Sequence, residues 1–185
     1  MKILFIDSCV RGEFSATRRY AEAWLEKYKK ESDEIEILRL AEENLTPHSA
    51  ARLEKRDALL DAGKTDDAMF RYARQFKEAD EIVIAAPYWD LSFPALLRIY
   101  FENVSVCGIT FRYEGAESVG CCAAKTARYF STCGGFTNGR HLGAEYARAL
   151  CKMFGIDEFE EYTVEGMDID TSQRETLLTE AIAKL

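Results

Sequence analysis

Short runs of consecutive apolar residues alternate along this chain with longer amphipathic stretches. The runs Lys2–Ile6 and Glu81–Ala86 are unbroken, which is typical of strands that are buried on both faces of a parallel sheet. Glu34–Leu40 and Glu158–Val164 alternate apolar with polar residues, and this pattern predicts strands at the edges of the sheet. Thr126–Ser131 completes a set of five predicted strands.

The stretches between the strands place apolar residues at helical spacing. The predicted helices cover Thr17–Lys30, Leu53–Glu78, Pro94–Cys107, Gly139–Phe154 and Thr171–Lys184. The second is interrupted near Gly63, so it forms either two helices or one kinked helix. Because strand and helix alternate five times, we expect an α/β fold: a doubly wound, five-stranded parallel sheet with helices on both faces. We find no repeat, low-complexity tract or linker, so residues 1–185 are expected to form a single domain.

The composition excludes several classes of partner. The chain has 185 residues, a formal net charge of −8 and 48% hydrophobic residues, as a globular protein does. This negative charge argues against nucleic acid and anionic membrane surfaces as partners. The N-terminus runs directly into the first strand without a signal peptide, and no apolar run approaches the ~20 residues of a membrane span. We therefore expect a cytoplasmic protein that binds no nucleic acid and no membrane.

The six cysteines are expected to be reduced thiols, because disulfides are rare without secretion. No Cys-x-x-Cys pair occurs and the chain has only two histidines, so no metal site is expected. Cys121 and Cys122 are adjacent, and the sequence around them supplies no evident positive charge of the kind that makes a reactive thiolate. We interpret this pair as inert packing residues.

Three segments that directly follow predicted strands are candidates for the functional site, because open α/β sheets bind ligands beyond the carboxyl ends of their strands. The first, Asp7–Arg19, carries the hydroxyls of Ser8, Ser15 and Thr17 and enters a helix near Ala16. Free N–H groups at a helix start, the helix dipole and hydroxyl donors together favour a phosphate site. The alternative is that Ser15 only caps the helix.

The second and third segments add aromatic residues and glycines. Pro87–Pro94 carries Tyr88 and Trp89, which a flat aromatic ligand would cover; in the alternative, Trp89 folds back onto the core. Thr132–Phe136 contains two consecutive glycines, which let backbone N–H groups approach a ligand closely but also occur in ordinary turns. Because the predicted fold brings all three segments to one edge of the sheet, together they predict one ligand site.

A resemblance to a known family is clearest in Ala86–Tyr113, APYWDLSFPALLRIYFENVSVCGITFRY. This segment resembles the FMN-dependent NADH-azoreductases and NAD(P)H:quinone reductases of the flavodoxin-like superfamily. The shared pattern is Ala-Pro before an aromatic tripeptide, then a helix, then Gly-x-Thr-Phe-x-Tyr at Gly108–Tyr113. The resemblance extends over nearly the whole chain and is weakest at about residues 45–75.

The resemblance implies a flavodoxin-like fold, FMN as cofactor, and NADH or NADPH as electron donor. Its implied FMN contacts form three groups. The phosphate would be held by Ser8, Ser15, Thr17 and the N–H groups near Ala16. The edge of the isoalloxazine ring would be lined by Pro87, Tyr88, Trp89, Asp90 and Leu91. The pyrimidine end of the ring would be approached by Thr132, Gly134 and Gly135, with Cys133 and Phe136 beside them.

Four residues of these loops qualify the resemblance. Relatives often have Asn where this chain has Asp90, and a carboxylate there disfavours a negatively charged reduced flavin. Cys133 occupies a position that is frequently Arg, so recognition of the nicotinamide or the acceptor is expected to differ. Arg11 and Arg18 either add positive charge near the phosphate or are exposed to solvent.

The resemblance therefore implies an enzyme that reduces a small acceptor, such as a quinone or an azo compound, by two-electron ping-pong transfer. The flavin carries the chemistry, so no catalytic side chain is expected. A homodimer is expected. The helix Pro94–Cys107 is apolar enough to form its interface; in the alternative, it belongs to the core of a monomer. Two alternatives remain: a flavodoxin-type one-electron carrier, and a binding domain of the same fold that has lost the flavin.

Overall fold

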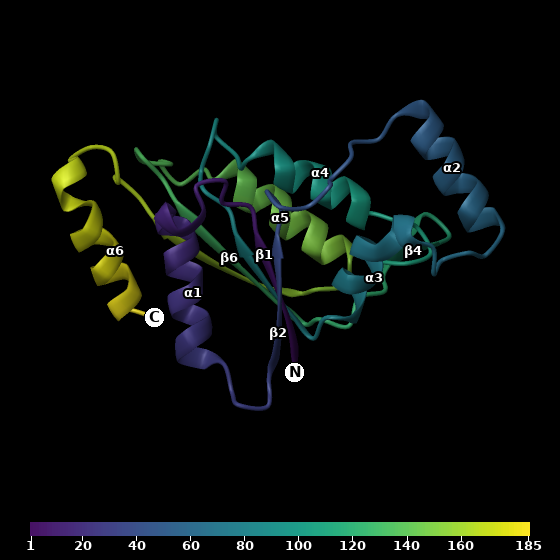
Figure 1. Ribbon diagram of the computed structural model, residues 1–185, viewed down its shortest axis with the longest axis horizontal. Coiled ribbons are helices and arrows are strands. Elements are labelled where there is room, and N and C mark those ends of the chain that lie inside the picture. Colours follow the sequence, from purple (N-terminus) through teal and green to yellow (C-terminus); the bar gives the residue numbers. More distant parts are fainter.

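A five-stranded parallel sheet is the centre of the computed structural model, which describes residues 1–185 (Figure 1). Its strands are β1 (Lys2–Asp7), β2 (Glu34–Arg39), β3 (Glu81–Ala85), β6 (Thr126–Thr132) and β7 (Glu158–Val164). The helices are α1 (Ala16–Tyr28), α2 (Ala50–Asp61), α3 (Arg71–Glu78), α4 (Ala95–Val104), α5 (Leu142–Met153) and α6 (Arg174–Ala183). Three short 3-10 helices, η1 (Gly12–Phe14), η2 (Ala68–Phe70) and η3 (Thr171–Gln173), complete these elements.

The strand order is β2-β1-β3-β6-β7, and every pairing in this sheet is parallel. The chain moves from β1 outward to β2 and then returns to the other side of β1, so the winding direction reverses between β1 and β3. In the register of the sheet Asp7 pairs with Ala85, and Thr132 pairs with Val164 at the end of β7. The carboxyl ends of β1, β3, β6 and β7 therefore open onto the same edge, where such folds bind ligands.

Successive side chains of the central strands enter two different cores, because side chains alternate across a strand. Leu4 and Ile6 of β1 pack with residues of α3, α4 and α5 on one face of the sheet. Ile3 and Phe5 pack with residues of α1 and α6 on the other face. Figure 1 shows α1 and α6 side by side on that second face. None of the helices has both the length and the apolar composition needed to cross a membrane.

The five predicted strands are confirmed, with β2 and β7 at the edges, and helices cover both faces. Several predicted helix limits were too wide. The helix predicted from Gly139 begins at Leu142, because Gly139 has a φ of 75° and His141 caps the helix. The region 53–78 forms two helices rather than one kinked helix, and α2 ends two residues before Gly63.

Two features of the fold were not predicted. The stretch around Gly108–Tyr113 leads into an antiparallel hairpin of β4 (Phe111–Glu114) and β5 (Glu117–Gly120), separate from the main sheet. Helix α2 has no buried residue and stands apart from the sheet layers, at the end of the molecule opposite α6 (Figure 1).

Helix α4 was predicted either to form a dimer interface or to belong to the core of a monomer. Leu97, Tyr100, Phe101 and Val104, which form its apolar stripe, are completely buried within the chain's own core. This stripe is not available to a second subunit, whereas the other side of α4 keeps exposed residues such as Ala95 and Arg98.

Candidate functional site

An open cleft of about 290 Å³ lies at the carboxyl edge of the sheet. Four loops form it, and they follow β1, β3, β6 and β7. Nine of the predicted site residues line it: Ser15, Ala16, Thr17, Pro87, Tyr88, Trp89, Thr132, Cys133 and Gly134. The cleft therefore brings together all three segments singled out in the sequence.

Five predicted residues do not line the cleft. Ser8 is completely buried, and its hydroxyl donates to the carbonyl of Ala85 at 2.9 Å, so its side chain supports the sheet edge. The other four follow the lining residues within the same loops: Asp90, Leu91, Gly135 and Phe136.

The β1–α1 loop forms the first wall and presents the start of α1 to the cleft. Ser15 caps the helix, its hydroxyl accepting the N–H of Arg18 at 3.3 Å, and it also lines the cleft. The first N–H groups of a helix have no intrahelical acceptor, and here they belong to Ala16 and Thr17, which both line the cleft. The Thr17 hydroxyl lies 2.7 Å from that of Thr132 and so joins the first wall to the third.

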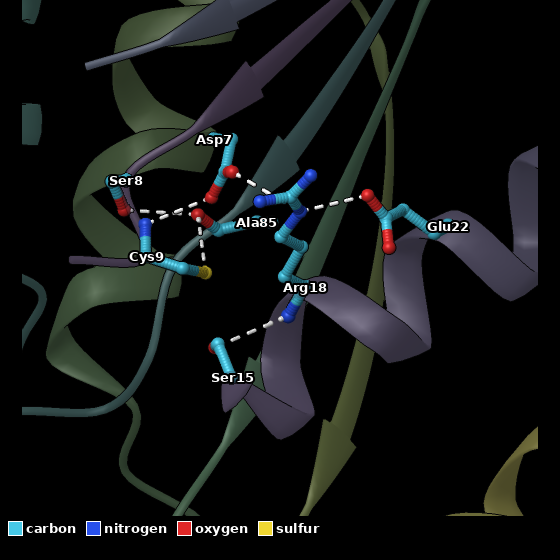
Figure 2. A network of polar contacts seen from close by, with 7 residues as sticks. All are labelled: Asp7, Ser8, Cys9, Ser15, Arg18, Glu22 and Ala85. Atoms are coloured by element: carbon cyan, nitrogen blue, oxygen red, sulfur yellow. Dashed lines mark hydrogen bonds and ion pairs between the residues drawn. The ribbon is translucent and has the colours of Figure 1, made fainter. Parts of the chain in front are cut away.

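Arg18 does not line the cleft, and its side chain is only 11% exposed, so the alternative that it is exposed to solvent is wrong. The guanidinium turns toward the Asp7 carboxylate and donates from Nε to Glu22 at 2.7 Å (Figure 2). Arg11 lines the cleft and has no ion-pair partner, so it is the cation of this loop that remains available.

The β3–α4 loop forms the second wall. Trp89 and Ser92 exchange backbone hydrogen bonds of 3.1 and 2.8 Å around a tight turn. The two central residues, Asp90 and Leu91, have φ values of 50° and 67°, a left-handed conformation that costs an L-residue about 1–2 kcal/mol. Their own N–H groups have no acceptor in the chain. Trp89 is 39% exposed, so it does not fold back onto the core.

The β6–α5 loop forms the third wall, and a second segment holds its backbone in place. The carbonyls of Cys133, Gly134 and Gly135 accept N–H groups from the segment that follows β7, at 2.8–2.9 Å. The N–H groups of Gly134, Gly135 and Phe136 have no acceptor. A Cβ at Gly134 would lie 2.3 Å from an oxygen of Asp168, so only glycine fits there without displacing that carboxylate.

The thiol of Cys133 is not an ionised group of this wall. Cys133 is 1% exposed, and burial raises its pKa to about 12, with the nearby Glu165 carboxylate acting in the same direction. The side chain at this position is therefore neutral.

A fourth wall was missed in the sequence. It comes from the segment after β7 and from the start of α6, and it contributes Met167, Asp168, Arg174 and Glu175. Arg174 donates to the Met167 carbonyl at 2.9 Å and pairs with the Asp168 carboxylate. Glu175 accepts two hydrogen bonds, of 2.9 and 2.7 Å, from the Arg19 guanidinium. The sequence did contain a signal for this wall: its segment follows the fifth predicted strand, and ligands of open α/β sheets bind beyond the carboxyl ends of the strands.

The donor set of the cleft fits a flat, monophosphorylated ligand such as FMN. Backbone N–H groups at Ala16 and Thr17, supported by the cation Arg11, suit a phosphate group. The unpaired N–H group of Gly134 in the lining, and those of the Asp90–Leu91 turn, which directly follows the lining residue Trp89, suit the carbonyl oxygens and ring nitrogens of a heterocycle.

The adjacent cysteines lie outside this cleft, near the β4–β5 hairpin. Cys122 is buried, which raises the pKa of its thiol to about 12, as expected of a packing residue. Cys121 differs from the prediction, because a guanidinium nitrogen of Arg112 lies 3.3 Å from its sulfur. The sequence could not show this neighbour, since the hairpin brings together residues nine positions apart.

A second hollow lies between the body of the molecule and α2, and it has a volume of about 520 Å³. Its lining is mostly polar and comes from the segment after β2, from α2, from η2 and from α3. Arg52, Lys55 and Arg71 line it opposite Glu43 and Asp67. None of the predicted site residues lies there.

Comparison with known proteins places the chain among flavin oxidoreductases. A family model described as "Flavodoxin-like fold" matches residues 1–185. The chain is 36% identical over 188 residues to the FMN-dependent NADH:quinone oxidoreductase of Clostridium perfringens, covering 99% of this chain and 95% of that protein. It is 34% identical to the FMN-dependent NADH:quinone oxidoreductase 2 of Clostridium acetobutylicum, with 99% and 95% covered.

Solved structures agree on the fold. An azoreductase from Bacillus anthracis superposes with a TM-score of 0.86 at 24% identity, covering 100% of this chain and 96% of that one. An FMN-dependent NADH-azoreductase from the same species, in complex with FMN, superposes with a TM-score of 0.79 at 20% identity, covering 99% and 96%. Together with the relatives above, these findings show that the chain belongs to the flavodoxin-like family that includes the FMN-dependent NADH:quinone oxidoreductases.

Proposed function

We propose that this chain is an FMN-dependent oxidoreductase that uses a nicotinamide nucleotide to reduce a small acceptor such as a quinone or an azo compound. The relatives' names supply FMN, NADH and quinone as the expected cofactor, donor and acceptor. When bound, FMN supplies the electron-transfer chemistry, so the protein's task is to bind and orient the ring and to shape access to it.

One observation carries the proposal. Unpaired backbone N–H groups line a single cleft from the loops after β1 (Ala16 and Thr17) and β6 (Gly134), and the turn after β3 carries two more, at Asp90 and Leu91, next to the lining residue Trp89. Backbone donors held by a sheet cost little to organise, because folding has already fixed them. Convergence of a phosphate-type and a ring-type donor set is what a flavin mononucleotide needs.

The residues divide the work as follows. Ser15, Ala16 and Thr17 hold the phosphate through N–H and hydroxyl groups, with Arg11 adding charge. The turn at Asp90 and Leu91 offers N–H groups to the ring edge, with Pro87, Tyr88 and Trp89 alongside, and the loop from Thr132 to Phe136 faces the pyrimidine end. We no longer count Ser8 among the phosphate-binding residues, because its hydroxyl already donates to the carbonyl of Ala85.

Donor and acceptor use the same open side of the cleft in turn, so steady-state kinetics are expected to be ping-pong. NADH is the donor named in relatives, and it is the expected donor here.

Exposed apolar side chains on the loops of this edge support a homodimer as the working form. Phe14, Leu91, Phe136 and Ile169 are each more than 60% exposed, and they belong to the four loops that form the cleft. An apolar rim of this kind is typical of a surface covered by another chain.

The six cysteines are all unpaired, which supports a location in the reducing cytoplasm.

Anaerobic mixing tests the function. Protein loaded with FMN is mixed with NADH or NADPH and then with benzoquinone, while flavin absorbance is followed. Full bleaching by a nucleotide and rapid recovery on quinone addition are expected. A flavodoxin-type carrier would not be bleached by either nucleotide, and a flavin-free binding domain would not retain FMN through gel filtration.

A further inference from the structure

A buried carboxylate faces the side chain of Arg18, in the first turn of α1 (Figure 2). Asp7, the last residue of β1, is 3% exposed and does not line the cleft. One of its oxygens accepts the N–H of Cys9 at 2.9 Å, and the other lies 3.6 Å from Nε of Arg18. Burial raises the pKa of Asp7, while the Cys9 N–H and the Arg18 cation oppose that rise. The proposed binding of FMN does not by itself explain why a charge is kept here.

Arg18 connects this carboxylate to the phosphate end of the cleft. Its backbone N–H is held by the Ser15 cap, one residue beyond the free N–H groups of Ala16 and Thr17. Its side chain lies between two carboxylates, those of Asp7 and Glu22 (Figure 2). Because two anions share one cation, the network carries a formal charge of minus one.

A phosphate monoester bound at the start of α1 brings up to about two negative charges close to this network. Asp7 and Glu22 repel it, and Arg18 attracts it, across a partly buried region where solvent screens charges weakly. The balance among the three side chains therefore adds to or subtracts from phosphate affinity without any of them touching the phosphate.

We propose that Asp7, Arg18 and Glu22 form a charge-setting network that determines how strongly the cleft prefers FMN to riboflavin, its phosphate-free counterpart. This inference rests on the proposed function, since it assumes that FMN binds with its phosphate at the start of α1. Asp7 and Arg18 act as positioning residues, because they work through the loop and through charge.

Two variants distinguish an effect of charge from a structural role. An effect of charge changes FMN affinity in opposite directions in the two variants, whereas a structural role weakens binding in both. Asp7→Asn keeps an oxygen to accept the Cys9 N–H but removes the negative charge, so FMN binding is expected to tighten. Arg18→Gln removes the only cation of the network, so FMN binding is expected to weaken. Each change is expected to be on the order of threefold to tenfold in Kd, with riboflavin affinity changing much less. The double variant returns the FMN-to-riboflavin preference toward that of the parent.

The experiment is a fluorescence titration of each apoprotein with FMN and with riboflavin, at one ionic strength. Glu22→Gln is expected to shift the preference in the same direction as Asp7→Asn but less, since its side chain is 43% exposed. Glu26→Gln is the matched control: it removes the same charge from an exposed residue of α1 that pairs with Lys29, outside the network. Thermal melts of the apoproteins verify folding, and if Asp7→Asn fails to fold, Arg18→Gln and Glu22→Gln decide the outcome.

Opposite signs for Asp7→Asn and Arg18→Gln, seen with FMN and not with riboflavin, support the network. The inference is overturned if both variants weaken FMN and riboflavin alike, which indicates a structural role, or if the preference does not change. If the parent binds riboflavin as tightly as FMN, or binds neither, the proposed placement of FMN fails as well. The parent titration thus separates the two failures.

Discussion

The two hollows of this molecule differ in how firmly the fold holds the residues that line them, and their volumes do not reflect this difference. The groove beneath α2 measures about 520 Å³ and the cleft at the sheet edge about 290 Å³. The larger hollow is bordered by α2, which buries none of its residues, and its charged groups are side chains on exposed or half-buried positions. The smaller one is formed by loops that each continue a buried or paired strand.

The difference shows what makes a hollow a binding site in this fold. In the cleft the donors are backbone N–H groups, held by the parallel sheet and by the hydrogen bonds between the third and fourth walls. In the groove the donors are long side chains, which lose rotamer entropy when a ligand orders them. Of the four predictions that follow, the first and the last compare the two regions, and the other two test how the surroundings of the cleft are held.

The strongest contrast is between two serines that cap helices in the same way. Ser15 caps α1 at the cleft and Ser49 caps α2 at the groove, each accepting an N–H at 3.3 Å. Ser15→Ala combined with Thr17→Val is expected to weaken FMN binding at least about tenfold, because each hydrogen bond lost to a charged phosphate costs roughly 1.5–3 kcal/mol. FMN titration of the refolded apoprotein measures this.

Ser49→Ala is the control for that pair. It loses a helix cap, which costs about 1 kcal/mol of stability, but its FMN affinity should equal that of the parent. A double variant at Ser15 and Thr17 that titrates like the parent would mean that the phosphate lies elsewhere.

The second contrast lies within the cleft, between two adjacent glycines. Gly134→Ala places a methyl group 2.3 Å from the Asp168 carboxylate, whereas Gly135→Ala meets no atom within 4 Å. The clashing atoms belong to the end of a side chain that is 61% exposed and can move away. We therefore expect the first to lower the free energy of unfolding by at most about 1 kcal/mol, through loss of the Asp168–Arg174 ion pair, and the second to change it by less than about 0.5 kcal/mol. Urea denaturation of the apoproteins measures both, and equal values for the two would contradict the close approach.

The third prediction concerns pH and the buried end of α5. His141 is 5% exposed, its Nδ1 accepts the N–H of Ala144 at 3.1 Å, and burial lowers its pKa. The unfolded chain therefore binds a proton at His141 more readily than the folded chain does, so stability is present above about pH 6.5 and falls as the pH drops below it. Urea midpoints at pH 7.5 and 5.5 measure the loss, and His141→Asn, which can still cap the helix, should reduce the slope. An unchanged slope in that variant would assign the pH dependence to other groups.

The smallest effect is expected in the groove. Arg52→Gln with Lys55→Gln removes two of its cations, and FMN affinity should stay within about twofold of the parent because exposed charges at a distance are screened by salt. A larger loss would indicate that α2 takes part in cofactor binding, and the contrast between the two hollows would then be wrong.

Hydrophobic periodicity was sufficient to predict the five strands and their order along the chain, because buried parallel strands read as continuous apolar runs. It did not predict β4 and β5, which are four residues each and mostly exposed. The positions of the predicted strand ends then located three of the four walls of the cleft, because ligands of open α/β sheets bind beyond those ends. The wall containing Asp168 and Arg174 was missed because its residues are ordinary charged ones, and only the cleft makes them significant.

The sequence by itself determined the order of strands and helices, the edge at which the site lies and the backbone segments that form it, since these follow from local periodicity and from the winding of a parallel sheet. Tertiary structure alone decided the direction of individual side chains. Ser8 turns to Ala85, Arg18 turns to Asp7 and Glu22, and Arg112 approaches Cys121. Such choices depend on which partners, distant in the sequence, folding brings within hydrogen-bonding distance, and no local pattern records those distances.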